Sequence, residues 1–459
     1  MTTESIFKSL ARVDENPNML TFQLRPTKVA YANTLRRMVL IGVESVAFRS
    51  DMNEKGQTTD VVVYENTTPM TNEMLADRIG LIPIHVKDPM TWNPDNYVFE
   101  LKVENTTEDT LPVKASDIVV KRRDVVVGAE GETVESFIEV PNKEFFHPDP
   151  VTGDTCLIAV LKGTLPNTAG QKIHLKAKAT VGTGRDHIRF SPVCQCSYGY
   201  TIDTDEAKLQ SQFEKWIRDS KNKKPEDLKE NAKLKDVLAA EFKTMEVQRC
   251  YVVDPATGEP NSFDFQVETI GVQPITQIIE TALKNIEAKC AKYASIDKDL
   301  PENLTVQNAD ARMKGFDFIF QHEDHTLGNL LQSYMDENMM GKDVTFVGYK
   351  VPHPLRDEMV VRVGMDFTGE EKDASELMAR VAVAKAAKEC AEMFRSWRES
   401  WMRESSKGFG ARNLASLAFT AENARQAEQA SALAAQAAKA PVTAKTAPKT
   451  AAKRVVTKQ

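Results

Sequence analysis

The chain contains two distant segments in which apolar positions first alternate and then recur every three or four residues. The alternating positions are Leu20, Phe22 and Leu24 in one segment and Phe316, Phe318 and Phe320 in the other. The recurring positions are Leu35, Met38, Val39 and Gly42 in the first, and Leu327, Leu330, Leu331 and Tyr334 in the second. Alternation places side chains on one face of a strand, and a spacing of three and four places them on one face of a helix. Each segment is therefore predicted to be a strand followed by a helix.

The two segments also share a short motif at the strand-to-helix junction. Residues 31–35 read Tyr-Ala-Asn-Thr-Leu, and residues 327–331 read Leu-Gly-Asn-Leu-Leu. We expect helices that begin near Asn33 and Asn329. A strand followed by an amphipathic helix is common in α/β proteins, so one such unit indicates little. The repetition of the unit together with the motif is what indicates two related halves.

The repeat extends to a second strand and helix in each part. Alternation at residues 263–267 precedes a helical stripe of Ile275, Ile278, Ile279, Ala282, Leu283 and Ile286. Alternation at residues 359–363 precedes a stripe of Leu377, Val381, Ala384, Lys388, Ala391 and Phe394, in which Lys388 is the polar interruption. The pattern predicts an α+β fold in which two related sheet-plus-helix halves form an internal pseudo-dimer.

The remaining regions differ in composition from these halves. Residues 52–172 are rich in Val and Thr and predict an inserted, mainly-β domain, while residues 204–245 are heavily charged and predict a solvated helical excursion, or alternatively a partner-docking surface. The expected organisation has a first dimerisation domain at residues 1–51 and 173–300 and a second at 301–411. Residues 412–459 are rich in Ala and Lys and predict a disordered basic tail.

Several of these segments resemble the alpha-like subunits of multisubunit RNA polymerases. Val29–Val39, Ala76–Pro83 and the stretch from Ile173 to Pro192, with Gly184-Arg-Asp-His187, resemble the third-largest subunit of the nuclear enzyme and its archaeal D-type counterpart. His325-Thr-Leu-Gly-Asn329 and Tyr349-Lys-Val-Pro-His-Pro354 are similar to the small partner subunit, the eleventh of the nuclear enzyme or the archaeal L type. The resemblance covers about residues 15–200 and 260–400. It implies a fusion of two subunits that are usually separate, which is expected in large cytoplasmic DNA viruses.

The resemblance implies a non-catalytic assembly subunit of a DNA-directed RNA polymerase that acts in transcription. Its pairing interface would contain Tyr31, Asn33, Leu35, Met38, Val39, Leu327, Asn329, Leu330 and Leu331. Arg36 and Arg37 would dock the second-largest subunit, because alpha-like subunits use arginines at this position, whereas the second copy has Gln332 and Ser333 there. The implied partners are the two largest subunits and small assembly subunits. With both halves in one chain, no homodimer is expected, and the implied location is the host cytoplasm or a viral factory, with packaging in the virion as an option.

Cysteine usage and hydropathy indicate a protein of a reducing compartment with no membrane segment. No apolar run approaches the roughly 18 residues that span a bilayer, and six scattered cysteines do not form a disulfide framework. Nuclear relatives often carry a four-cysteine zinc cluster in the insert, and some archaeal relatives carry iron–sulfur clusters. Here no cysteine precedes Cys156, and Cys194-Gln-Cys196 cannot fill four positions, so neither metal nor cofactor is expected.

Charge is distributed unevenly along the chain. Residues 431–459 carry six Lys or Arg and no acid, and since the whole chain carries −7, residues 1–430 carry −13. Because phosphate contacts need Lys and Arg, direct DNA binding by the folded body is not expected. A nucleic-acid-binding module that uses the basic tail remains the alternative function.

The sequence offers little that suggests catalysis. It lacks the zincin, nucleophile-elbow and phosphate-loop motifs. Asp203, Asp205 and Glu206 are interpreted as turn residues, and Asp324, between His322 and His325, as a helix N-cap. An enzyme with an unrecognised site is the second alternative.

Overall fold

The computed structural model describes residues 5–14, 16–51, 60–127, 133–223, 232–310, 313–341, 344–365 and 372–412. Among them, one compact unit comprises the residues up to Thr201 together with Val252–Arg412, and a second comprises Ile202–Tyr251. The expected tail lies outside the described residues, apart from Arg412.

Two sheets of the first unit have the same strand order. The first is ordered β12-β13-β2-β1-β18 and the second β16-β17-β15-β14. The strands of the first sheet are β1 (Phe7–Val13), β2 (Asn16–Leu24), β12 (Val193–Tyr200), β13 (Phe263–Thr269) and β18 (Gly410–Arg412). Those of the second are β14 (Leu304–Asn308), β15 (Gly315–Gln321), β16 (Val344–Lys350) and β17 (Glu358–Met365). Every neighbouring pair is antiparallel except β1 and β18, which are parallel.

Each sheet is accompanied by two helices at equivalent places in the chain. In what we call the first half, α1 (Val29–Ile41) follows β2 and α6 (Ile275–Ala291) follows β13. In the second half, α7 (His325–Met339) follows β15 and α8 (Lys372–Ser405) follows β17. The predicted α+β class with two related halves is confirmed. The helices begin one turn earlier than expected, so Asn33 and Asn329 each lie in a second turn.

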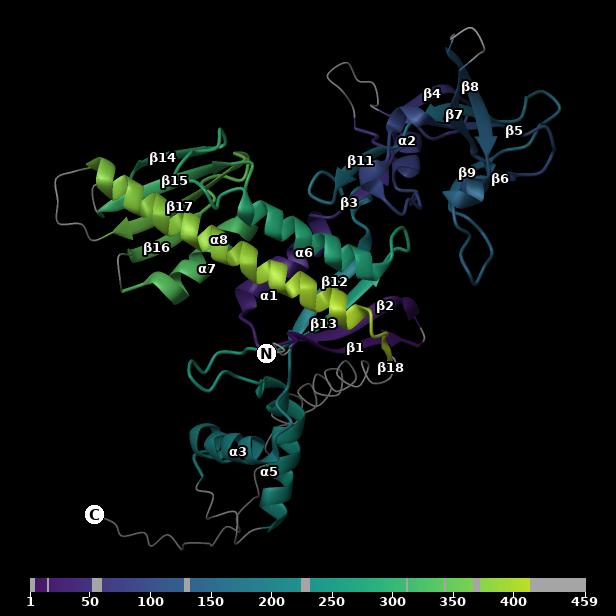
Figure 1. Cartoon of the computed structure of the whole chain (residues 1–459). Helices are drawn as coiled ribbons and strands as arrows, with labels where there is room; N and C mark the ends of the chain where they lie inside the picture. Colours follow the sequence, from purple (N-terminus) through teal and green to yellow (C-terminus); the bar gives the residue numbers. More distant parts are fainter. Residues whose placement is uncertain are drawn as a thin grey trace, which may run out of the picture. The chain divides into compact units, whose positions relative to one another are not determined.

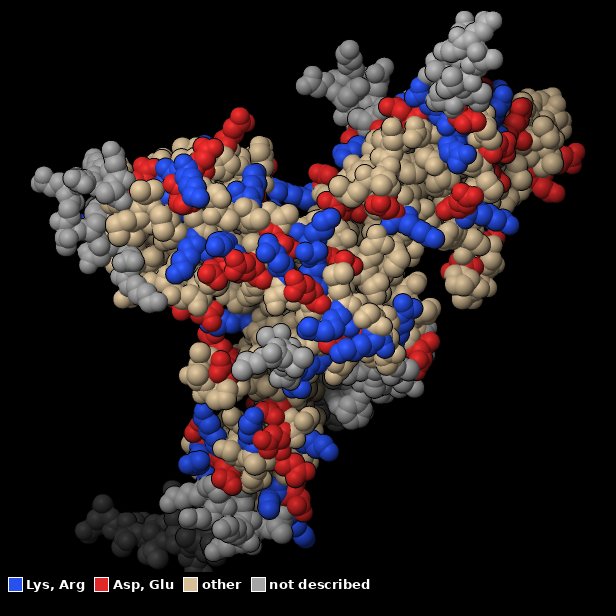
Figure 2. All heavy atoms as spheres, viewed as in Figure 1, with Lys and Arg blue, Asp and Glu red and all other residues tan. Residues whose placement is uncertain are grey.

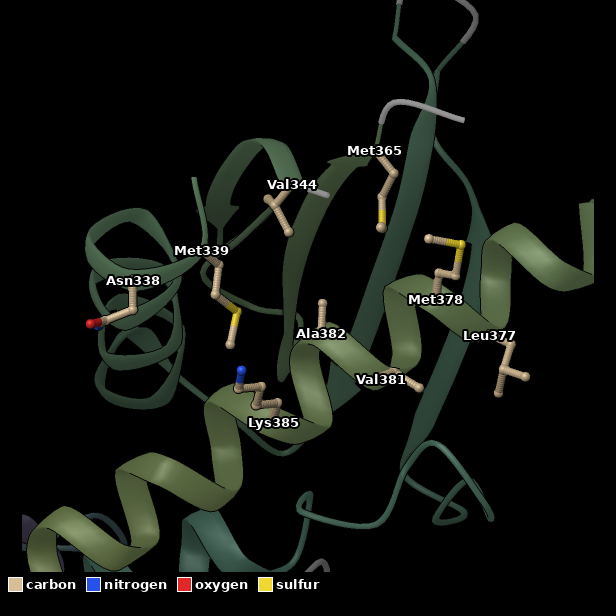
Figure 3. Close-up of a pocket in the computed structure, with 9 residues that line it drawn as sticks. All are labelled: Asn338, Met339, Val344, Met365, Leu377, Met378, Val381, Ala382 and Lys385. Carbon is tan, nitrogen blue, oxygen red and sulfur yellow. The ribbon is translucent and has the colours of Figure 1, made fainter. Parts of the chain in front are cut away.

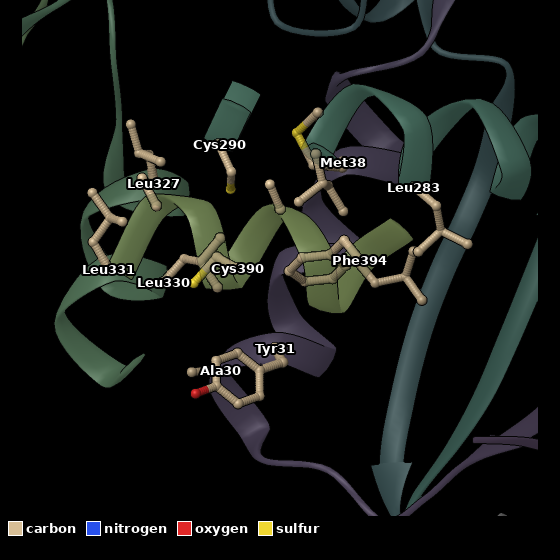
Figure 4. Packing of buried hydrophobic residues seen from close by; sticks show 14 of the residues in the cluster. Ala30, Tyr31, Met38, Leu283, Cys290, Leu327, Leu330, Leu331, Cys390 and Phe394 are labelled. Carbon is tan, nitrogen blue, oxygen red and sulfur yellow. The ribbon is translucent and has the colours of Figure 1, made fainter. Parts of the chain in front are cut away.

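The two halves share one hydrophobic core (Figure 4). Its cluster of buried residues includes the following side chains from all four helices: Leu35, Met38 and Val39 of α1, Leu283 and Ile286 of α6, Leu327, Leu330 and Leu331 of α7, and Cys390 and Phe394 of α8. Helix α1 packs against both α6 and α7, and α8 packs against the same two helices. Neither half therefore encloses its apolar residues without the other.

Helix α8 belongs to both halves (Figure 1). It packs on β15 and β17 of the second sheet and reaches β1 of the first. There Trp401 is fully buried, its ring centroid lies 5.1 Å from that of Phe7, and its indole nitrogen donates a hydrogen bond of 3.0 Å to the Thr276 carbonyl. Trp397 and Trp401 thus both lie in the core.

The buried face of α8 differs from the expected stripe. Ala384, Ala391 and Phe394 are buried as expected, but Leu377 and Val381 are each 48 % exposed. The buried positions that the stripe omitted are mainly small: Ala379, Val383, Ala386, Ala387 and Cys390. Around Leu377 and Val381 an apolar pocket opens, in which Met378 points toward Met365 (Figure 3). Small residues let α8 approach the sheet and its neighbouring helices closely.

The insert has its own sheet and its own core. The five-stranded sheet has the order β4 (Val61–Asn66), β10 (Lys172–Ala177), β5 (Tyr97–Glu104), β7 (Val119–Val127) and β8 (Thr133–Val140). It is joined by the pairs β3 (Glu44–Ala47) with β11 (Thr180–Thr183) and β6 (Leu111–Lys114) with β9 (Leu157–Leu161), and by α2 (Asn72–Gly80). The expected boundary at residue 173 falls inside β10, so β12 is the first strand that returns to the first half.

The described residues of the second unit include two α-helices that pack together. Helices α3 (Glu206–Lys221) and α5 (Ala232–Met245) pack through a small core of Phe213, Ile217, Leu238 and Phe242. Asp205 caps α3 by accepting a hydrogen bond of 3.0 Å from the Ala207 backbone N–H. The charged segment is therefore helical, and Asp205 serves as a cap.

Replacing Leu331 with Asp tests the shared core. Leu331 is fully buried, and an unpaired carboxylate there should lower the free energy of unfolding by at least about 3 kcal/mol. The matched control is Leu377→Asp on the exposed face of α8, which we expect to change it by less than about 1 kcal/mol. Urea titration followed by circular dichroism measures both, and equal stabilities of the two variants would contradict the shared core.

Two C-terminal truncations test the role of β18. A chain that ends at Arg412 retains β18 and Phe409, whose ring lies 5.2 Å from the Arg12 guanidinium, and should melt as the full chain does. A chain that ends at Lys407 leaves the β1 edge unpaired and should melt at a lower temperature. Indistinguishable melting of the two truncated chains would show that β18 adds nothing to stability.

Candidate pairing interface

The apolar residues expected at the pairing interface come together in the structure. Tyr31, Leu35, Met38, Val39, Leu327, Leu330 and Leu331 are all buried in the cluster that both halves share. Asn33 and Asn329 are only half-buried. The Asn33 side chain accepts a hydrogen bond of 3.0 Å from Arg36 on its own helix. The motif asparagines thus lie at the rim of the core.

Gly328 is required by the packing of α7 on its sheet. A methyl group at this position would lie 2.5 Å from the Tyr349 ring and 3.1 Å from the Met359 sulfur. When Asn33 is aligned with Asn329, Gly328 corresponds to Ala32, which is also fully buried. Both copies of the motif therefore place a small residue at this buried helix position.

A tyrosine and a glutamate join the two helices at one end of their contact. The Tyr31 hydroxyl of α1 donates a hydrogen bond of 2.9 Å to Glu337 of α7. Burial, and next the charge of Glu337, raise the pKa of Tyr31 far above its usual value, so the hydroxyl remains a donor at physiological pH. Lys28 lies 3.4 Å from the same carboxylate.

Arg37 reaches across to the start of α7. Its Nε donates a hydrogen bond of 2.8 Å to the Thr326 hydroxyl, and its Nη2 lies 3.4 Å from Asp324. Asp324 is also the N-cap of α7, because its side chain accepts a hydrogen bond of 2.8 Å from the Thr326 backbone N–H. Burial alone would raise the pKa of Asp324, but the Thr326 hydrogen bonds, Lys289 and Arg37 lower it below its usual value.

The two arginines of the motif have different environments. Arg37 has partners in the second half of the same chain, whereas Arg36 is half-buried and bonded to Asn33 on its own helix. The charge of Arg36 also lies near Cys196 and Tyr198 of β12. The docking role that the resemblance implied for both residues thus suits Arg36 better, because Arg37 already bridges the halves.

A second polar connection links the halves through the turn before α7. Arg185 donates hydrogen bonds of 2.8 Å to the His322 carbonyl and 2.7 Å to Asp357. His322 has a positive φ of 61°, and its Nδ1 lies 2.8 Å from the other Asp357 oxygen. Hydrogen bonds to the carbonyl and to the side chain of His322 therefore hold this residue in its uncommon left-handed backbone conformation.

A buried acid completes this connection. Glu323 is 7 % exposed, accepts a hydrogen bond of 2.9 Å from the Tyr293 hydroxyl, and lies 2.6 Å from Lys289. The spacing of Lys289, Tyr293, Glu323 and Asp357 in the sequence gives no sign that these residues meet. Of the residues in this connection, Arg185 alone belongs to a short motif that resembles the polymerase subunits.

The segment Ala76–Pro83 has a structural role within the insert. The Arg189 side chain is 4 % exposed and hydrogen-bonds to the Phe48 carbonyl and to Ser50, which itself donates to Asp77 at 2.6 Å. A methyl group on Gly80 would lie 2.7 Å from the Arg189 guanidinium. The glycine of this segment therefore makes room for a buried arginine that connects α2 to the segment after β3.

The described residues offer no metal centre and no membrane span. Within the described ranges, no three His, Cys, Asp or Glu side chains are grouped so that they could hold an ion. None of the helices the structure describes is long and apolar enough to cross a membrane. On the face seen in Figure 2, Lys and Arg are interspersed with Asp and Glu.

Comparison with known proteins gives two matches to one kind of domain. Residues 21–290 and residues 316–400 each match a family model described as the RNA polymerase Rpb3/Rpb11 dimerisation domain. The first match spans more than half of the chain and contains the insert. The two matches correspond to the two halves of the structure.

Curated relatives are similar over most of their own lengths. The chain is 27 % identical to the DNA-directed RNA polymerases I and III subunit RPAC1 of Bos taurus over 318 residues, which are 62 % of this chain and 84 % of the relative. It is 24 % identical to the DNA-directed RNA polymerase subunit Rpo3 of Aeropyrum pernix over 296 residues, 62 % of this chain and 94 % of the relative. The chain therefore belongs to the RNA polymerase Rpb3/Rpb11 dimerisation-domain family, and it carries two such domains.

Proposed function

We propose that this chain is a non-catalytic assembly-platform subunit of a DNA-dependent RNA polymerase that supplies both members of the dimerisation pair itself. The observation that carries the proposal is that two matches to one dimerisation domain occur in a single chain and share one hydrophobic core. Covalent connection raises the effective concentration of one half for the other to the order of mM for a flexible link. Pairing then needs no second subunit.

The outer faces of the paired halves dock the two largest subunits, which carry the active site, and the small assembly subunits. Arg36 is the residue we assign to the second-largest subunit, because its guanidinium suits bidentate hydrogen bonds to carboxylates. Its hydrogen bond to Asn33 stays within α1, whereas Arg37 bridges the two halves. We place the first half around residues 1–51 and from β12 to residue 300, and the second half around 301–411. The insert extends beyond the expected residue 172, because β10 belongs to its sheet.

The fused arrangement supports an origin in a large cytoplasmic DNA virus. The protein would then act in the host cytoplasm or in a viral factory. The acidic charge of residues 1–430 favours assembly over DNA binding by the folded body. Salt-sensitive DNA binding by the isolated chain would instead favour the alternative, a nucleic-acid-binding module that uses the basic tail.

Purification of the chain with its natural partners tests this function. A tagged full chain expressed in its native setting should co-purify with two large subunits and with RNA synthesis activity that depends on a DNA template. Mass spectrometry identifies the partners. Recovery of the chain alone, or with proteins unrelated to transcription, would contradict the proposal.

Substitution of Arg36 tests the docking assignment. Arg36→Ala should leave the melting temperature of the isolated chain unchanged and weaken capture of the second-largest subunit by roughly 2–5 kcal/mol if the contact is buried. Gln332→Ala, at the matching position of α7, is the control and should matter much less. Undiminished capture by the Arg36 variant would show that this face of α1 is not the docking site.

A further inference from the structure

The helix N-caps at the α1–α7 contact carry opposite charges. Lys28 is the N-cap of α1, and Asp324 is the N-cap of α7. These two positions correspond when Asn33 is aligned with Asn329. Each N-cap lies near the later turns of the other helix, so that Lys28 approaches Glu337 at 3.4 Å and Asp324 approaches Arg37 at 3.4 Å.

The charges at this contact are sorted by half. The first half supplies the cations Lys28 and Arg37, and the second half supplies the acids Asp324 and Glu337. Two neighbouring ion pairs follow the same rule, since Lys289 of the first half contacts Glu323 of the second, and Arg185, in the segment that leads into β12, contacts Asp357. The contact between α6 and α8 has the opposite order, because Glu287 of the first half pairs with Arg395 and Arg398 of the second. The sorting of cations and acids is therefore a property of the α1–α7 contact and the turn before α7.

The same geometry is unfavourable for two identical halves. If a copy of the first half took the place of the second half, its Lys28 would occupy the position of Asp324 beside Arg37, while the uncharged Ile41 would replace Glu337. If a copy of the second half took the place of the first, its Asp324 would occupy the position of Lys28 beside Glu337, while Ser333 would replace Arg37. Each like pairing thus brings one pair of like charges together. Like charges at these distances repel, and repulsion against the wrong partner is an effective source of specificity.

We propose that this sorting of charge makes the α1–α7 contact selective for unlike halves, so that the chain closes on itself and rejects pairing with the like half of a second copy. The excluded partner is therefore another molecule of the same protein. The proposal rests on the pairing of the halves seen in the fold and not on their role in transcription. Its test measures pairing alone, so that its failure would leave the docking proposal standing.

An exchange of the two N-cap charges tests this selectivity in the full chain. The double variant Lys28→Asp with Asp324→Lys keeps the composition of charges but places like charges together in both contacts between unlike halves. The same exchange would make both kinds of like pairing complementary. We expect the melting temperature to fall by about 3–8 °C and a concentration-dependent dimer to appear in native mass spectrometry.

The control is a fourfold variant that adds Arg37→Glu and Glu337→Arg to that exchange. It restores opposite charges between unlike halves with their signs reversed, and it shares the loss of the Asp324 cap. We expect it to be a monomer that melts above the double variant, by a margin that shrinks in about 1 M salt because the side chains are partly exposed. If the fourfold variant is no more stable and no more monomeric than the double variant, or if the double variant behaves as wild type, the proposal is wrong.

Discussion

The structure depends on the burial of one apolar surface to which both halves contribute. Each sheet presents a row of large side chains, such as Phe22 and Phe265 in the first and Phe318 and Phe320 in the second. In the described part of the chain, each half contributes two helices of its own to cover its sheet. The helices α1 and α7 pack against each other, so the cover of one sheet becomes part of the cover of the other. Because burial of apolar area is the dominant favourable contribution to folding, separation of the halves would expose the centre of the core.

Helix α8 makes this dependence asymmetric. It begins on the second sheet and ends against Phe7 and Phe22 of the first, where Trp401 is buried. Strand β18 then extends the first sheet at the edge of β1. The second half therefore completes the first in two ways, by covering its apolar face and by pairing its exposed strand edge. Fusion into one chain suits this arrangement, since the elements that complete the first half follow the strands of the second half in the chain.

Polar contacts at the pairing interface add selectivity to this apolar burial. The side chains of Arg37, Asp324, Lys28 and Glu337 are 22–36 % exposed, so each ion pair contributes little to stability by itself. Their value lies in their arrangement, because Lys28 and Asp324 occupy corresponding positions, so that pairing of like halves would bring one pair of like charges together. The buried Glu323, unlike these partly exposed pairs, should contribute to stability. Its removal would leave Lys289 and Tyr293 without their shared hydrogen-bond acceptor, which is costly in a buried site.

The sequence correctly predicted the helix and strand faces that are marked by large apolar side chains. Leu35, Leu331 and Phe394 are buried as their spacing indicates, and the repeat of strand and helix is present in both halves. It misplaced the buried face of α8, because alanines carry a weak hydrophobic signal while the exposed Leu377 and Val381 carry a strong one. It also missed β18, a strand of three residues, and the partners of Arg37, which lie on a helix far away in the chain. Contacts between distant polar residues leave no periodic trace in a sequence.

Sedimentation equilibrium of the purified full chain tests the internal pairing most directly. A chain whose halves pair with each other has no remaining partner surface of that kind, so one species of 51.2 kDa is expected over the whole range of protein concentration. A species of twice that mass, which persists on dilution, would show that the halves pair between molecules and would contradict the internal pseudo-dimer.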